Sequence, residues 1–117
     1  MKEEKEDLVF FIAGVGHYNL HKVIKEISFG DELDIEQEPT NLFDPNAIKV
    51  HFFSPIRGEY VHIGYVPAKL CEQVNSLLLS FDSTARCSVI GIYPNNADFR
   101  KLKVKVFPQE IGKNNES

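Results

Sequence analysis

Between residues 101 and 106 the chain alternates strictly between lysine and aliphatic side chains, a pattern that only an extended backbone accommodates. Lysines occupy the odd positions, and Leu102, Val104 and Val106 occupy the even ones. Successive side chains of a strand point to opposite faces, whereas a helix would mix the two kinds around its circumference. The segment therefore predicts a strand with one buried face and one face that carries lysine.

Five further segments are rich in strand-forming residues and are bounded by turn residues such as Pro39, Pro45 and Gly58. With the last strand, placed at residues 99–107, they cover residues 8–13, 33–37, 47–53, 60–66 and 84–93. Six short strands with little helix are typical of a small all-β barrel. We expect an all-β, six-stranded small barrel that is closed or nearly closed.

Two segments have helical periodicity. In residues 20–27 the aliphatic side chains follow i, i+3, i+4, i+7 spacing, which indicates a short amphipathic helix or, alternatively, an irregular loop packed on the core. After Pro67, a residue suited to the first turn of a helix, the apolar stripe Leu70, Val74 and Leu77 predicts a firmer helix that ends near Ser80.

The length of 117 residues suits one domain, which we place at residues 8–111 between a flexible lead-in (1–7) and a flexible tail (112–117). The formal net charge is −4 and the pI is about 5.5. Residues 8–112 keep a charge of −2. This balance argues against sequence-blind nucleic-acid binding through bulk charge, so any such contact must be local and short.

Cys71 and Cys87 lie sixteen residues apart without a CxxC pair, which favours a reduced, cytoplasmic setting over a disulfide framework. The apolar run at residues 8–15 is too short to cross a bilayer, and its acidic leader has the wrong sign for a signal peptide. We expect no membrane association.

Neither a metal site nor catalytic machinery is evident. His17 and His21 have helical i, i+4 spacing, but His17 is expected to precede the helix. Gly14-Val15-Gly16 lacks the third glycine of a dinucleotide-binding loop, and no nucleophile elbow or P-loop is present. We expect no metal, no cofactor and no enzymatic activity.

Three segments resemble HIRAN domains in order and spacing. Residues 38–50 (EPTNLFDPNAIKV) resemble the family's signature of an acidic-Pro pair, an Asn, an aromatic-Asp pair and Asn-Ala before a hydrophobic strand. Residues 12–18 resemble its first strand with an aromatic end, and residues 63–67 resemble the strand that leads into its helix. The resemblance spans roughly residues 10–80.

HIRAN domains are OB-like. They occur alone in bacteria and phages or are fused to helicase-like ATPases and nucleases of DNA repair, and the best understood members hold the 3′ end of single-stranded DNA. The resemblance thus implies a stand-alone bacterial or phage domain that binds single-stranded DNA or a 3′ DNA end, with a helicase or nuclease as a possible partner in trans.

Eight residues are candidates for DNA binding, and all of them except Tyr93, a further ring at the end of the fifth predicted strand, lie at or near positions that the family uses. Asp44 would accept a hydrogen bond from a terminal 3′-hydroxyl, or it would order the Asp-Pro-Asn turn, and both roles are compatible. The other seven are candidates for base contacts, stacking or phosphate binding: His17, Tyr18, Asn41, Phe43, Tyr65, Lys69 and Tyr93. Gly16 and Ala68 depart from the pattern, because some members carry basic residues there.

Two alternatives remain open. The lysine stripe at residues 101–105 could track a nucleic-acid backbone, but it also fits the solvated face of an outer strand. The acidity and the missing basic residues also fit a protein-interaction module on the same barrel. A pocket formed jointly by residues 40–46, Tyr18 and Tyr65, lined by aromatic rings and positive in potential, would favour DNA.

Overall fold

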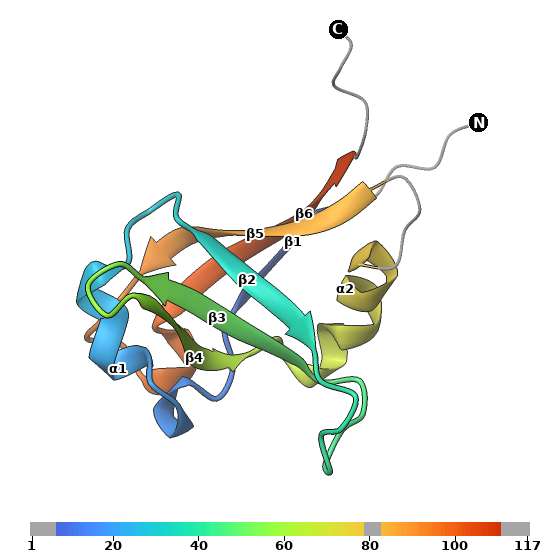
Figure 1. The fold of residues 1–117 in the computed structure, drawn as a ribbon, viewed down its shortest axis with the longest axis horizontal. Coiled ribbons are helices and arrows are strands. Elements are labelled where there is room, and N and C mark those ends of the chain that lie inside the picture. The colour runs from blue at the N-terminus through green and yellow to red at the C-terminus, as the bar shows by residue number, and fades with distance from the viewer. Residues whose placement is uncertain (1–6, 79–82, 111–117) are drawn as a thin grey trace, which may run out of the picture.

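The computed structural model describes residues 7–78 and 83–110, and its main feature is a six-stranded antiparallel sheet (Figure 1). The strand order is β1-β6-β5-β2-β3-β4. The six predicted strands are confirmed, with the bounds β1 Leu8–Phe11, β2 Glu32–Gln37, β3 Ile48–Ser54, β4 Glu59–Tyr65, β5 Ser83–Ile92 and β6 Leu102–Glu110.

The two edges of the sheet, β1 and β4, are joined by one bridge just beyond β1. The N–H of Ala13 donates to the carbonyl of Tyr65 (2.8 Å), and the N–H of Tyr65 donates to the carbonyl of Ala13 (2.9 Å). Gly64 permits this approach, because a Cβ there would lie 2.5 Å from the Ala13 carbonyl oxygen. The sheet is therefore an OB-like barrel that curls round but is not fully closed.

The alternating face of β6 supplies the centre of the core. Leu102, Val104 and Val106 are fully buried, as their period-two spacing predicts. The alternative that placed the lysine stripe on an outer strand was wrong, because β6 lies between β1 and β5. Lys103 extends over the ring of Phe11, its opposite residue on β1, with Nζ 5.8 Å from the ring centroid.

Both predicted helices are present. α1 (Leu20–Val23) continues into a 3₁₀ turn, η2 (Ile24–Glu26), and buries Leu20, Val23 and the following Ile27. Another 3₁₀ turn, η3 (Ala68–Leu70), begins directly after Pro67 and leads into α2 (Cys71–Leu78). α2 packs against β5 and β6 through its buried side chains, and the expected end at Ser80 lies outside the described residues.

The largest differences from the predicted strand boundaries are at the two ends of β6, which lies three residues later than residues 99–107. Phe99, expected to open this strand, lies in the 3₁₀ turn η4 (Asp98–Arg100) and is 65% exposed. Apart from Asp7, whose carboxylate lies 3.8 Å from Nζ of Lys105, the expected lead-in and tail lie outside the described residues. None of the described helices is long and apolar enough to cross a membrane.

Candidate DNA-end pocket

A pocket of about 300 Å³ forms where three distant segments meet, and we call it the end pocket. Residues 13–18 form one wall, the loop between β2 and β3 forms another, and the end of β4 with the start of the helical segment closes it. In Figure 1 this loop projects beyond the ends of β2 and β3. Six of the eight predicted site residues line the pocket: His17, Tyr18, Asn41, Phe43, Asp44 and Tyr65.

The loop is shaped by side chains that bond to its own backbone. Oδ1 of Asn41 accepts hydrogen bonds from the N–H groups of Phe43 (2.8 Å) and Asp44 (2.9 Å). Oδ1 of Asp44 in turn accepts one from the N–H of Asn46 (2.9 Å). Asn41 and Asp44 therefore order the loop, as the turn-forming alternative for Asp44 predicts. Oδ2 of Asp44 has no hydrogen-bond partner among the described residues.

The carboxylate of Glu38 connects the loop to β4. Its Oε1 accepts hydrogen bonds from Oη of Tyr65 (2.7 Å) and from Nδ2 of Asn41 (2.9 Å), while Nζ of Lys49 lies 3.8 Å from Oε2. These hydrogen bonds, from Tyr65 above all, lower the pKa of Glu38. Burial and the bond to this carboxylate raise the pKa of Tyr65. Glu38 thus fixes the orientation of two pocket residues.

Aromatic rings form the wall opposite the loop. The rings of Tyr18 and His62 are inclined by 33°, with centroids 4.3 Å apart. Tyr65 meets both rings edge-on, at 5.4 Å from Tyr18 and 5.0 Å from His62. A register shift in the β3–β4 pairing places His51 opposite His62, with their ring centroids 5.3 Å apart. His62 and Tyr65 therefore pack against the Tyr18 ring and hold it in place.

The two imidazoles of this cluster are held in the neutral form. Burial lowers the pKa of His62, against the opposing effect of its 3.0 Å hydrogen bond with the Gly64 carbonyl. Burial likewise lowers the pKa of His51, and nearby Lys49 adds to the effect. At neutral pH, His62 therefore supports Tyr18 as an uncharged ring.

Sequence reasoning missed Glu38 and His62 as parts of the site. Glu38 could have been found, because it is the acidic residue of the signature that opens at residue 38. His62 had no such signal, since its contact with Tyr18 joins positions far apart in the chain. Cys71 was not among the predicted site residues, yet it lines the pocket, and burial raises the pKa of its thiol.

Two predicted site residues lie outside the lining. Lys69 is exposed on η3, one residue after Ala68, which does line the pocket. Tyr93 folds back over Gly91 and lies against Phe11, with ring centroids 6.1 Å apart. Of the described residues that line the end pocket, none is lysine or arginine, whereas Asp44 contributes a carboxylate. The positive potential that would favour DNA is therefore not supplied by the lining itself.

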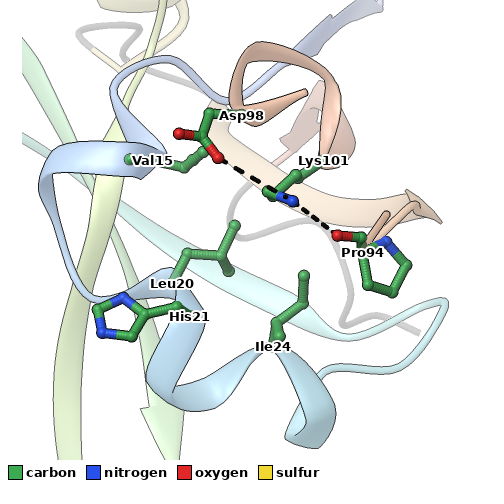
Figure 2. A pocket seen from close by; sticks show the side chains of 8 residues that line it. Val15, Leu20, His21, Ile24, Pro94, Asp98 and Lys101 are labelled. Carbon is green, nitrogen blue, oxygen red and sulfur yellow. Dashed lines mark hydrogen bonds and ion pairs between the residues drawn. The ribbon is translucent and has the colours of Figure 1, made fainter. Parts of the chain in front are cut away.

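A different pocket, of about 330 Å³, lies on the other side of the 3₁₀ turn η1 (Val15–His17), and Figure 2 shows its lining. Lys101 lies 4.0 Å from the carboxylate of Asp98 and donates to the carbonyls of Pro94 (2.6 Å) and Asn96 (2.8 Å). A Cβ on Gly16 would lie 2.3 Å from Asp98 Oδ2. A carboxylate thus occupies the space beside Gly16, and Lys101 serves to fix the η4 loop.

Comparisons with known proteins agree with this architecture. The family model of the HIRAN domain matches residues 5–108. Among solved structures, the crystal structure of the HIRAN domain of human HLTF superimposes with a TM-score of 0.56 at 16% sequence identity. The match covers 90% of this chain and 77% of that chain. The search of curated proteins found no match.

Proposed function

Because the chain belongs to the HIRAN domain family, whose domains bind DNA, we propose that its end pocket receives the 3′ end of a single DNA strand. The observation that carries this proposal is the convergence of three distant segments on one pocket. They bring a stacking ring (Tyr18), a loop ring (Phe43) and a carboxylate (Asp44) to one cavity of about 300 Å³.

The two oxygens of the Asp44 carboxylate differ in their contacts, and this difference supports recognition of a free 3′ end. One oxygen of its carboxylate orders the loop, and the other is available to accept a hydrogen bond from a 3′-hydroxyl. A phosphate at the same place would meet like-charge repulsion. The terminal base would stack on Tyr18, whose ring is supported by His62 and Tyr65.

In this proposal the protein is a binding module without catalytic activity of its own. It would act as an accessory factor in DNA repair or replication-fork processing, in the cytoplasm, with a helicase or nuclease as a separate chain. The pocket itself offers ring faces, on which bases stack without strong preference for sequence.

The test compares two labelled single strands, one ending in a 3′-hydroxyl and one in a 3′-phosphate, by fluorescence anisotropy. We expect the hydroxyl strand to bind more tightly by about 1.5–3 kcal/mol, the range for a hydrogen bond to a charged group. Asp44→Asn retains an oxygen for the turn and should abolish most of this difference. Equal affinities of the wild-type protein for both strands would refute end recognition.

A second function, docking of a protein partner, is favoured by one specific observation. Leu42 and Phe43 at the loop tip are 94% and 97% exposed, and no cation is found among the described residues that line the pocket beside them. Exposed apolar side chains beside a pocket are typical of interaction sites. If the protein binds no single strand even at low salt, this surface becomes the place to look for a peptide ligand.

A further inference from the structure

A smaller pocket of about 160 Å³ lies behind the aromatic wall of the end pocket, and we call it the cationic pocket. It is formed by α1 with the residue before it, by the turn between β3 and β4, and by the first half of β4. Its lining is mostly polar and includes two cationic side chains, Lys22 and Arg57. The lining residues are Asn19, Lys22, Arg57, Glu59, Tyr60, Val61 and His62.

The two cations of this pocket are not neutralised by neighbours. Lys49, Arg86, Lys101 and Lys105 each form an ion pair, but neither Lys22 nor Arg57 does so with any described residue. Glu59 lines the same pocket and pairs with neither of them within the described residues. In an acidic protein, two unpaired cations beside one cavity form a local site for an anion.

The cationic pocket and the end pocket share one wall. Tyr18 lines the end pocket and His62 lines the cationic pocket, and the two rings stack with their centroids 4.3 Å apart. The backbone reinforces this junction, because the N–H of Asn19 donates to the carbonyl of His62 (3.1 Å). The Tyr18 and His62 rings therefore form the wall between the end pocket and the cationic pocket.

The opposite side of η1 is less suitable for a phosphate chain. There Lys101 is paired with Asp98 and donates to the Pro94 carbonyl (Figure 2). Lys101 also donates to the Asn96 carbonyl, and the Asp98 carboxylate lies beside Gly16. A strand leaving the end pocket in that direction would meet a carboxylate and a lysine that is already paired. Electrostatics therefore favours a path over Tyr18 and His62.

We infer that the cationic pocket binds a backbone phosphate of the same DNA strand, so that the strand runs from the end pocket across the Tyr18–His62 stack to Lys22 and Arg57. This inference rests on the proposed function and adds to it a direction for the strand. It also explains how an acidic domain can bind a polyanion although the described lining of its end pocket has no cation. The cations that neutralise the strand, Lys22 and Arg57, lie in the neighbouring cationic pocket.

The experiment measures the salt dependence of binding to a single strand of roughly ten nucleotides, within the range of sites for OB folds. The double variant Lys22→Ala/Arg57→Ala should lower the salt slope by about 0.7, the contribution of one phosphate that is no longer neutralised on a single strand. Lys25→Ala is the matched control, because Lys25 is exposed on η2 next to α1 but does not line the pocket. Glu59→Gln should strengthen binding at low salt.

The outcomes separate this inference from the proposed function. If the wild-type protein binds and Asp44→Asn weakens end discrimination, but the double variant has the slope of Lys25→Ala, the strand path is refuted and end binding stands. If the wild-type protein binds no single strand, both fall. Because Lys22 and Arg57 are exposed, the double variant should have the same thermal unfolding midpoint as the wild-type protein. Measuring this midpoint checks that the double variant is folded.

Discussion

Oη of Tyr65 at the end of β4 donates a 2.7 Å hydrogen bond to Oε1 of Glu38, the residue that follows β2. Because the same oxygen accepts a hydrogen bond from Asn41, the interaction ties the pocket loop to the aromatic wall. We expect Glu38→Gln and Tyr65→Phe each to destabilise the fold by about 1 kcal/mol and to weaken DNA binding.

The double variant tests whether the two residues act together. Removing both partners should cost less than the sum of the single changes, with a coupling energy of about 1 kcal/mol in urea unfolding. Additive effects would show that the bond does not hold the loop to β4. Glu36→Gln is the control, since Glu36 is an exposed carboxylate on β2 outside the end pocket.

Tyr18 should contribute stacking energy, and Tyr93 should not. Tyr18→Ala is expected to weaken binding to single strands of any composition by about 1–3 kcal/mol while leaving the salt slope unchanged. Tyr93→Ala should leave the affinity unchanged, because this ring lies against Phe11 and outside the pocket lining. Anisotropy titrations at several salt concentrations measure both quantities, with unfolding midpoints recorded in parallel because Tyr18 is half-buried. Equal losses of DNA affinity in Tyr18→Ala and Tyr93→Ala would contradict the proposal that DNA binds in the end pocket.

Gly64 should be the glycine least tolerant of a side chain. A Cβ there would lie 2.5 Å from the Ala13 carbonyl and 2.6 Å from Cγ2 of Ile12, so Gly64→Ala must separate β4 from the segment after β1. We expect a loss of about 3 kcal/mol in the free energy of unfolding. Gly58→Ala is the control: its φ of 68° also favours glycine, but a Cβ would meet open space, so the cost should be about 1 kcal/mol. Denaturant unfolding of both variants measures the difference.

The lowered pKa values of His51 and His62 predict a loss of stability in weak acid. Both groups titrate near 6.5 when unfolded and at lower pH when folded, chiefly because burial disfavours the charged imidazole. The unfolded chain therefore binds more protons in this window, so the stability is fully present above about pH 6.5 and declines as the pH falls through the folded values. Protonation of Glu38 reduces the stability further only below its ordinary pKa of 4.5, because its pKa is lower in the folded protein.

Urea unfolding at about pH 7 and about pH 5.5 measures this dependence. His62→Phe keeps a ring against Tyr18 and should remove the share due to His62, so that the difference between the two pH values shrinks. An unchanged difference in this variant would assign the effect to other groups.

Local patterns in the sequence determined the elements of this fold. The alternation at residues 101–106 places Leu102, Val104 and Val106 in the core, and the stripe of Val74 and Leu77 forms the buried face of α2. Both patterns act within a few residues, because each side chain's direction follows from its own backbone. The signature at residues 38–50 likewise places Asn41 and Asp44 in a loop that they order themselves.

Only the tertiary structure decided which of these residues share a site. Strand order and register place β6 inside the sheet and bring His62 against Tyr18. They also direct Tyr93 toward Phe11 and away from the pocket, although the sequence offers Tyr93 as a further stacking candidate beside Tyr18. The cationic pocket arises in the same way, since Lys22 and Arg57 meet only because α1 packs against β4. Such arrangements depend on the pairing of strands far apart in the chain, which no local periodicity specifies.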